Sequence, residues 1–216
     1  MNTNTFVILT TFSMIFIILS YYGIIRYLKL HIDSQSKYVE NYKNLPKASE
    51  NNKVIISFSS NINKINKIMP MLKSILDQTV KVDQIVLNLP PDDNYNIPKE
   101  YNDILNIFYC GKDYCEATKL IPTLLREDNA DTIIILLKDD YIYGKDFIET
   151  MIEELNKHNS AIISNNGILI KTSFFDPKVV LQEKNNKNLT EDWILNNIKN
   201  KKKYIKYREN FKSFKI

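Results

Sequence analysis

Hydrophobic and polar residues divide this chain of 216 residues into an uncharged N-terminal run and a longer region of short, alternating apolar segments. The run Phe6–Ile25 reads FVILTTFSMIFIILSYYGII and contains no charged side chain. Twenty residues of α-helix are about 30 Å long, which is the thickness of the hydrocarbon core of a bilayer. The pattern therefore predicts a single-pass membrane anchor within residues 1–28.

Two other interpretations of this run stay open. A cleaved signal peptide has basic residues before its apolar core and small residues at its cleavage site, and neither feature is present. A buried core helix is the other interpretation, although core helices rarely lack polar residues over such a length. Arg26, Lys29 and Lys37 follow the run and no basic side chain precedes it, which favours a cytosolic domain. A glycan on Asn188, the asparagine of a sequon, would indicate a lumenal domain instead.

After a polar linker, residues 29–52, short β-branched runs alternate with segments of helical periodicity. Strands are predicted in 53–60, 83–90, 107–109, 131–137, 161–164 and 167–170. Helices are predicted in 62–76, 117–126, 147–156 and 191–199. Pro70 either kinks the first of these helices or starts it afresh. Strands separated by helices are typical of an α/β fold with a mainly parallel sheet, here one domain over residues 53–198.

Charge is distributed unevenly along the chain. The net charge is +4, but residues 199–216 carry eight basic side chains and one acidic one, a net charge of +7. The preceding body, from Arg26 to Ile198, therefore has a net charge of −3. The basic tail suits an amphipathic helix on anionic lipid. Its aromatic residues, interleaved with Lys and Arg, also suit nucleic acid, but the anchor and the acidic body make nucleic acid the less favoured partner.

Several common catalytic and nucleotide-binding motifs are absent from the sequence. With four glycines, the chain has neither a G-x-G-x-x-G fingerprint nor a Walker A loop, and it has no G-x-S-x-G elbow. His31 and His158 are isolated, which argues against histidine-based triads and metal sites. Cys110 and Cys115 lack partners at metal-ligand spacing, and free thiols agree with a reducing compartment.

The most informative segment is Lys138-Asp139-Asp140, which follows the most apolar predicted strand. In open α/β sheets, ligands bind at the carboxyl ends of the strands. Two carboxylates there can hold Mg²⁺ or Mn²⁺, which in turn carries a diphosphate and neutralises the charge of the leaving phosphate. A solvated turn, with aspartate selected for turn geometry, explains the same residues. This segment by itself does not distinguish the two interpretations.

Several segments in order resemble glycosyltransferases of the GT-A fold, and most closely family-2-like members found in large DNA viruses and microbes. The likeness covers about residues 53–205 and is carried by VIISFSS, MLKSILDQTVKVDQIVLNLP, DYCEATKLIPTLLRED, DTIIILLKDDYIYG, FFD and EDWILNNI. DYCEATKL is similar to the family segment D-x-G-P-x-T-K-L near the donor's phosphates, and IIILLKDDYIY to I-L-D-D-D-x-x-Y. EDW resembles the acidic pair that supplies the base for the acceptor hydroxyl.

This resemblance implies a sugar transferase that uses a nucleotide-sugar donor of the UDP type, Mn²⁺ or Mg²⁺, and a glycan, lipid or protein acceptor. Asp140, together with Asp139, is implied to hold the metal. Asp192, and after it Glu191, is implied to take the acceptor's proton. A helix N-terminus capped by Thr190 explains the same two acids. The implied donor-binding residues are Ser57, Ser59, Asn88, Asp113, Lys119, Lys138 and Asp139.

The sequence departs from the family pattern at three places. Lys138 replaces the first acid of the metal motif, where its ammonium could pair with a phosphate or repel the cation. Cys115-Glu116 replaces Gly-Pro, and an arginine that usually follows the first strand is missing, with Lys64 or Lys67 as stand-ins. These departures leave open a second hypothesis, a catalytically degenerate relative that acts as a membrane-associated binding or scaffold protein.

Overall fold

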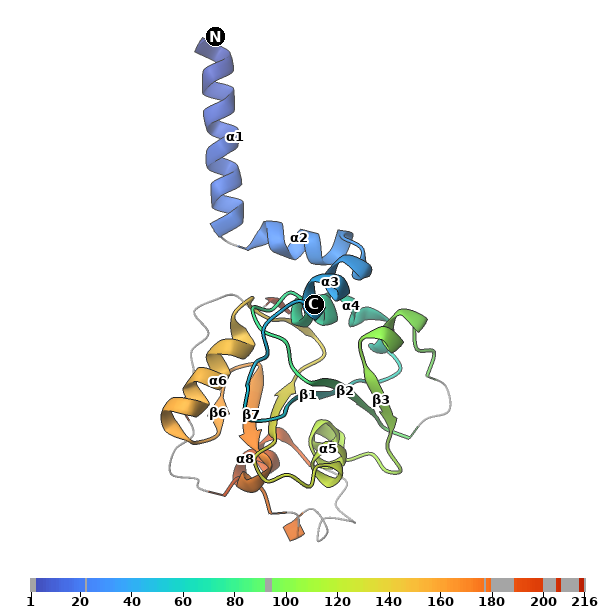
Figure 1. The fold of residues 1–216 in the computed structure, drawn as a ribbon. Coiled ribbons are helices and arrows are strands. Elements are labelled where there is room, and N and C mark those ends of the chain that lie inside the picture. The colour runs from blue at the N-terminus through green and yellow to red at the C-terminus, as the bar shows by residue number, and fades with distance from the viewer. Residues whose placement is uncertain are drawn as a thin grey trace.

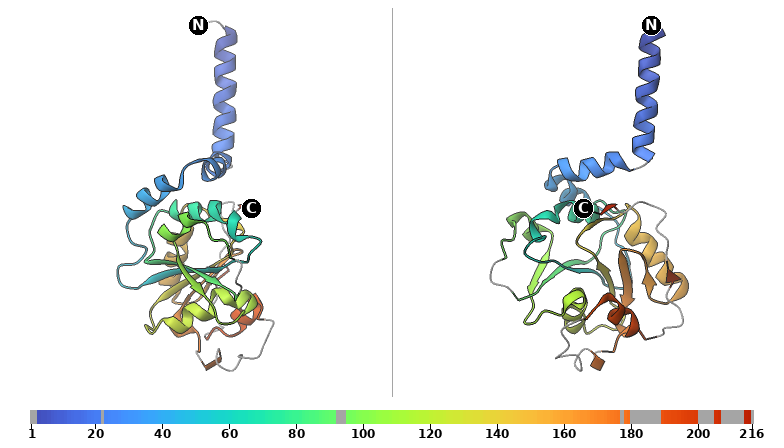
Figure 2. Two further views of the ribbon diagram at one scale, coloured as in Figure 1. Left: turned by 90° about the vertical axis from the view of Figure 1, so that its right-hand side faces the viewer. Right: turned by 180° about the vertical axis from the view of Figure 1, so that it is seen from behind.

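A single helix stands apart from an α/β domain in which a sheet lies between two layers of helices (Figures 1 and 2). The structure is a computed structural model, and it describes residues 3–21, 23–91, 95–176, 178–179, 189–199, 205–206 and 214–215. Helices α3 and α4 cover one face of the sheet, and helices α5 and α8 cover the other (Figure 1).

The main sheet has seven strands in the order β3-β2-β1-β4-β7-β6-β8. These strands are β1 (Val54–Ser59), β2 (Gln84–Leu89), β3 (Asn106–Tyr109), β4 (Ile133–Leu137), β6 (Ile162–Ile163), β7 (Gly167–Lys171) and β8 (Ile205–Lys206). Strand β7 is antiparallel to both of its neighbours, whereas every other neighbouring pair is parallel. The α/β fold with a mainly parallel sheet is thus confirmed.

Helices connect the strands, and all four predicted helical segments contain helix. The helices are η1 (Ile65–Lys67), α4 (Met69–Leu76), η2 (Lys99–Asp103), η3 (Cys115–Lys119), α5 (Ile121–Arg126), α6 (Phe147–His158), η4 (Thr172–Phe174) and α8 (Glu191–Asn196). Of these, η2 and η4 were not predicted. The helix expected over residues 62–76 is divided, because Pro70 lies in the first turn of α4, where its missing N–H costs nothing. Pro70 therefore starts the helix afresh.

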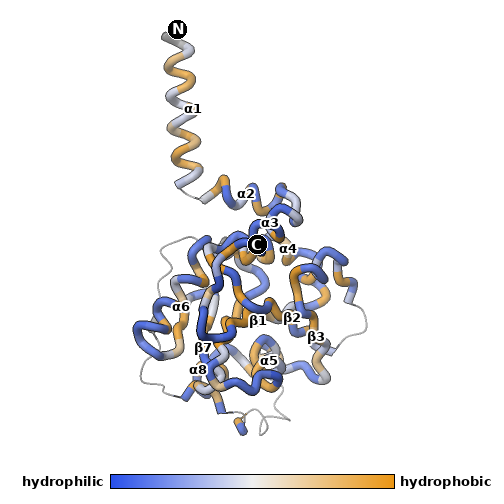
Figure 3. Tube along the Cα trace, viewed as in Figure 1, coloured by the Kyte–Doolittle hydropathy of each residue, from blue (hydrophilic) through white to orange (hydrophobic). Residues whose placement is uncertain are grey.

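The core lies between the sheet and its helices. All five residues of β4 are buried, as a strand covered on both faces by helices requires. Each buried Ile or Leu contributes about 1.5–3 kcal/mol relative to an exposed one. Figure 3 shows the apolar residues gathered on the strands and on α1, with hydrophilic residues on the loops around the domain. Strands β1 and β4 are paired side by side in this core, and the candidate site lies at their carboxyl ends.

The apolar N-terminal run forms two helices instead of one straight helix. Helix α1 (Thr3–Tyr21) ends before Gly23, whose φ of 70° lies in the left-handed region that glycine favours, and α2 (Ile24–Ile32) follows. Within the described residues, no single helix has both the length and the apolar composition of a membrane span. The pair Thr5–Tyr21 and Ile24–Ile32 has them together, but with a bend of 77° between the two parts.

The segment predicted as a polar linker, residues 29–52, contains the end of α2 and all of α3 (Gln35–Lys43). Leu30 and Tyr38 from these helices are buried against the domain. Arg26 of α2 forms an ion pair with Asp77 at 2.7 Å between Nε and Oδ2. Helices α2 and α3 are thus packed against the domain, mainly on α4, instead of forming a free tether.

Five residues of the basic tail are described, and all of them except Lys199 are extended. Strand β8 pairs with β6, and β9 (Phe214–Lys215) pairs with β5 (Tyr141–Ile142) in a separate two-stranded sheet. The expected amphipathic helix is wrong at these positions, because their backbone groups pair with strands of the domain. The remainder of the tail and Asn188 lie outside the described residues.

Candidate functional site

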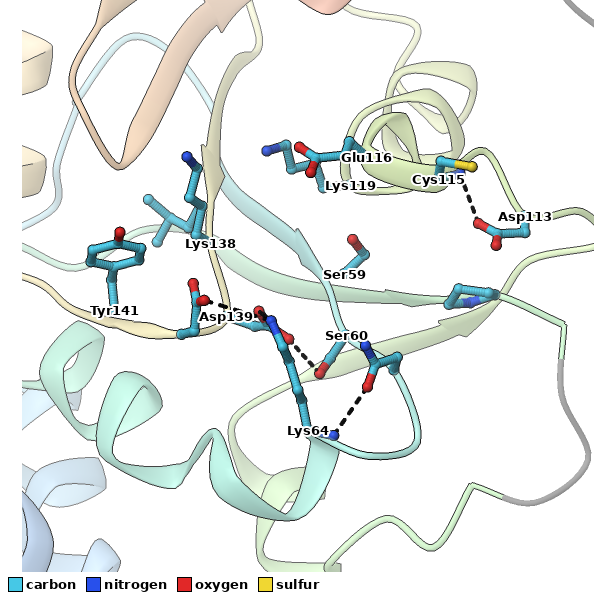
Figure 4. A pocket seen from close by; sticks show the side chains of 14 residues that line it. Ser59, Ser60, Lys64, Asp113, Cys115, Glu116, Lys119, Lys138, Asp139 and Tyr141 are labelled. Carbon is cyan, nitrogen blue, oxygen red and sulfur yellow. Dashed lines mark hydrogen bonds and ion pairs between the residues drawn. The ribbon is translucent and has the colours of Figure 1, made fainter. Parts of the chain in front are cut away.

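A pocket of about 440 Å³ opens at the carboxyl ends of β1 and β4 (Figure 4). Strand β1 lies between β2 and β4 and is parallel to both. The chain continues from β1 to β2 and β3 on one side of β1, and β4 then lies on its other side, so the strand order reverses here. Ligands of open α/β sheets bind in the crevice at such a switch point. The pocket is lined by Ser59, Ser60, Asn61, Lys64, Pro90, Asp113, Cys115, Glu116, Lys119, Leu137, Lys138, Asp139, Asp140 and Tyr141.

The two acids after β4 hold a lysine that follows β1. Lys64 Nζ lies 3.4 Å from Asp139 Oδ1 and 3.6 Å from Asp140 Oδ2. Ser60 donates a hydrogen bond of 2.7 Å to the other oxygen of Asp139 (Figure 4). Burial lowers the pKa of the Lys64 ammonium, but the charges of the two acids outweigh burial and raise that pKa above its ordinary value. Of the two lysines expected as stand-ins for the missing arginine, Lys64 lines the pocket and Lys67 does not.

The turn that carries these acids is fixed from below by Tyr143, whose side chain is buried. Its hydroxyl accepts a hydrogen bond of 2.7 Å from the N–H of Lys138. The same hydroxyl lies 3.0 Å from the carbonyl oxygens of Lys138 and Asn166, and it can donate to one of them. The backbone of Lys138 thus has hydrogen-bond partners on the buried Tyr143 side chain, which holds the turn in place.

On the opposite side of the pocket, one carboxylate bridges two lysines. Glu191, at the start of α8, lies 3.4 Å from Lys119 Nζ and 3.2 Å from Lys138 Nζ. Lys119 is almost completely buried, with 5% of its surface exposed, so its charge requires this partner. Burial alone would raise the pKa of the Glu191 carboxyl, but the charges of Lys119 and Lys138 outweigh burial and hold that pKa below its ordinary value.

Replacing Glu191 by glutamine should therefore reduce the acid sensitivity of the fold. A carboxyl whose pKa is lowered on folding stabilises the protein above its ordinary pKa, and this contribution is lost as pH falls through the lowered value. We expect the unfolding free energy of Glu191→Gln, measured by urea denaturation in steps from pH 6 downwards, to fall less steeply in acid than that of the wild type. Glu153→Gln on the exposed surface of α6 is the matched control. Equal acid slopes for Glu191→Gln and the wild type would contradict the bridged arrangement.

Helix η3 begins with Cys115, at the position where the resembled segment has glycine. Cys115 has a φ of 53°, in the left-handed region that glycine favours. Asp113 accepts hydrogen bonds from the N–H of Cys115, at 2.7 Å, and from the hydroxyl of Thr118, at 3.1 Å. Asp113 therefore lines the pocket and also holds the turn that brings Lys119 into it.

Two predicted donor-binding residues, Ser57 and Asn88, lie beneath the pocket and do not line it. Both are fully buried. Ser57 donates a hydrogen bond of 2.5 Å to the carbonyl oxygen of Lys119, and Asn88 donates one of 3.0 Å to the Ser57 hydroxyl. These side chains therefore support the strand ends and η3 from below. Ser59, by contrast, lines the pocket as expected.

The acidic pair of the EDW segment is divided between the site and the solvent. Thr190 caps α8, and its hydroxyl accepts from the N–H of Trp193. Glu191 contacts the lysines of the site, whereas Asp192 is exposed. The cap explains why acids occur in this first turn, and the ion pairs of Glu191 add a contact with the site that the cap does not require.

The expected divalent cation does not fit the described donor set. Within the residues that the structure describes, no group of three or more His, Cys, Asp or Glu side chains is placed to hold a metal ion. Asp139 and Asp140 are suitable oxygen ligands, but the ammonium of Lys64 lies between them and the ammonium of Lys138 is on the adjacent residue. A divalent cation at this point would have to displace the ammonium of Lys64. The metal therefore stays a prediction from resemblance.

Comparison with solved structures finds proteins with a similar fold. The structure is similar to 4-diphosphocytidyl-2C-methyl-D-erythritol synthase from Anaerococcus prevotii, with a TM-score of 0.54 and 11% identity over 76% of this chain and 90% of that one. A protein from Desulfovibrio desulfuricans, assigned as a nucleotide-diphospho-sugar transferase, has a TM-score of 0.45 and 12% identity over 73% of this chain and 80% of that one.

A mannosyltransferase from Pyrobaculum calidifontis, solved with GDP-Man and Mn²⁺, has a TM-score of 0.44 and 14% identity over 73% of this chain. This chain spans 48% of the length of that enzyme. No protein-family model and no curated protein sequence matches the chain. The likeness thus concerns the fold alone, and activity has to be argued from the site.

Proposed function

We propose that this protein transfers a sugar from a nucleoside-diphosphate donor and that α1 holds it at a membrane. The observation that supports the donor most directly is the pocket at the ends of β1 and β4, which gathers three lysines: Lys64, Lys119 and Lys138. Ammonium groups on several sides of a pocket suit a diphosphate, because each can donate hydrogen bonds to phosphate oxygens. The pocket volume, about 440 Å³, is in the range of small-ligand sites.

In the proposed reaction, the hydroxyl oxygen of the acceptor forms a bond to the anomeric carbon as the bond from that carbon to the diphosphate breaks. The electron pair of the broken bond leaves with the nucleoside diphosphate, and the acceptor's proton passes to a carboxylate. Asp192 and Glu191 are the proposed proton acceptors. The ion pairs of Glu191 with Lys119 and Lys138 hold its pKa below its ordinary value and make it a poorer proton acceptor, so Asp192 is proposed first.

The membrane part of the proposal is supported by the exposure of α1. Its described side chains carry no charge, and the helix projects from the domain without covering the core (Figure 3). The alternative function, a binding or scaffold protein without turnover, is favoured by one observation: Lys138 stands where the family has an acid. The transferase and the scaffold hypotheses both predict that a nucleoside diphosphate binds. Only the transferase hypothesis predicts that a nucleotide-sugar is turned over.

A panel of nucleotides and sugar donors tests this function. The full chain, purified from the membrane fraction, should bind one of UDP, GDP, CDP or ADP with a dissociation constant in the range of about 1 µM to 1 mM that is usual for substrates. The corresponding nucleotide-sugar should release its nucleoside diphosphate, measured both with EDTA and with Mn²⁺. Asp140→Ala should reduce that release. Binding without release would favour the scaffold, and a folded protein that binds none of the four would contradict the proposal. Extraction by alkaline carbonate would contradict the anchor.

A further inference from the structure

The position between the two acids of the site is taken by an ammonium group of the protein itself. Asp139 is nearly buried, with 10% of its side chain exposed, and its two oxygens face Ser60 and Lys64. Lys64 reaches both acids from the segment after β1, at 3.4 and 3.6 Å. Ser60, Lys64 and Asp139 all line the pocket, so this contact belongs to the candidate site and is not a distant surface pair (Figure 4).

A divalent cation at this place would have to displace that ammonium. Mg²⁺ requires oxygen ligands at 2.0–2.1 Å in nearly octahedral geometry, so both carboxylates would have to turn towards one point. The ammonium of Lys64 already lies within ion-pair distance of both carboxylates. Lys138 adds a second positive charge on the residue directly before Asp139. The charge of Lys64 therefore already offsets one of the two negative charges that would attract the cation.

We infer that Lys64 takes the place of the divalent cation, and that the site binds the diphosphate of its donor through lysine ammonium groups. This inference rests on the proposed function. An ammonium has three N–H donors, so Lys64 can keep both carboxylates and still donate to a phosphate oxygen. Lys119 and Lys138, bridged by Glu191 on the other side of the pocket, supply the second pair of donors.

The same ammonium serves the chemical step. As the bond between the anomeric carbon and the diphosphate breaks, negative charge develops on the departing phosphate oxygen. A positive charge that is already fixed beside this oxygen lowers the barrier without reorganising, because Asp139 and Asp140 hold the Lys64 side chain in place. The carboxylates thus act as positioning residues for a lysine, instead of as metal ligands.

Two titrations of the full chain test this inference. In EDTA, the wild type should bind inorganic pyrophosphate and a nucleoside diphosphate from the panel of UDP, GDP, CDP and ADP, and Mn²⁺ should change these affinities less than about threefold. Lys64→Gln should weaken both about 10- to 100-fold, the usual effect of losing one charge-assisted hydrogen bond. Electron paramagnetic resonance should show Mn²⁺ bound more tightly to Lys64→Gln than to the wild type, because the variant leaves both carboxylates to the ion. Lys67→Gln, at an exposed lysine of η1 three residues after Lys64, is the matched control and should behave as the wild type.

The outcomes separate this inference from the proposed function. Nucleoside diphosphates that bind the wild type only with Mn²⁺ would overturn the role of Lys64 and leave the function standing. Unchanged affinity in folded Lys64→Gln would also overturn that role. Pyrophosphate bound in EDTA, with no nucleotide or nucleotide-sugar bound, would overturn the function and leave the lysine site standing. A folded wild type that binds neither probe would overturn both.

Discussion

Replacing Lys119 by methionine is expected to lower the affinity of the site for its nucleoside-diphosphate donor about 10- to 100-fold. Lys119 is the most deeply buried cation of the pocket, with 7% of its side chain exposed, and water screens its charge least. A charge-assisted hydrogen bond in such a place contributes about 1.5–3 kcal/mol. Methionine keeps the length and the apolar packing of the lysine stem, so the change removes the charge with little change in volume.

The measurement is a titration of the donor diphosphate by calorimetry, with the unfolding midpoint recorded for each variant. Lys99→Met, on the exposed surface of η2, is the matched control and should leave the affinity unchanged. Lys119→Met should also raise the pKa of Glu191, because one of the two positive charges that lower it is removed. Unchanged donor affinity in a folded Lys119→Met protein would remove Lys119 from the binding site.

Three central strands of this fold, β1, β2 and β4, could be read from the sequence because they are buried on both faces. Such strands appear as short apolar runs, and the run predicted over residues 131–137 became β4 within two residues at its start. The parallel arrangement followed from the alternation of strands and helices. The sequence pattern could not show the burial of α2 and α3, because Leu30 and Tyr38 are buried only by tertiary contacts with the domain.

The helix break at Gly23 also depended on more than hydropathy. An apolar run of constant character predicts a straight helix, whereas the left-handed backbone at one glycine turns the chain by 77° between α1 and α2. A glycine inside an apolar run permits this conformation and does not require it. The sequence thus permits a bend at Gly23, and in the bent chain α2 packs on α4.

The site was predictable at the positions where local order along the chain places residues at one sheet edge. Lys138, Asp139 and Asp140 follow a buried strand, so their location at the carboxyl end was fixed by that strand. The partner of the two acids was harder to foresee, because Lys64 precedes Asp139 by 75 residues and is one of two lysines on the same short segment. A glutamate selected as a base candidate turned out to bridge two lysines, a contact between segments 72 residues apart.

Asn88 shows why a polar residue at a strand end is not always a ligand contact. The sequence places Asn88 at the end of β2, where donor-binding residues are expected. The sequence pattern did not indicate that its side chain is fully buried. Its side chain donates to the hydroxyls of Ser57, at 3.0 Å, and Thr123, at 2.9 Å. Its carbonyl oxygen accepts a hydrogen bond of 2.8 Å from Arg126, whose guanidinium also stacks 3.8 Å from the centre of the Phe108 ring.

Replacing Asn88 by leucine should therefore destabilise the domain by about 3 kcal/mol. The change leaves two buried hydroxyls and one half-buried guanidinium with fewer partners, and each unsatisfied group costs about 1–3 kcal/mol. For a chain of this size, we expect a fall of roughly 6–12 °C in the melting temperature. Urea denaturation gives the free energy. Asn106→Leu, at an exposed position of the neighbouring β3, is the matched control and should change stability by less than about 0.5 kcal/mol.

A second substitution distinguishes a hydrogen-bond network from simple packing. If unsatisfied polar groups cause the loss, Thr123→Val in the Asn88→Leu background should recover part of it, because it removes one of the groups left without a partner. Purely additive losses would contradict the network. Since Ser57 in this network also holds the backbone of Lys119, Asn88→Leu should weaken donor binding although its side chain never reaches the pocket. Full donor affinity in that variant would show that the position of Lys119 does not depend on the buried network.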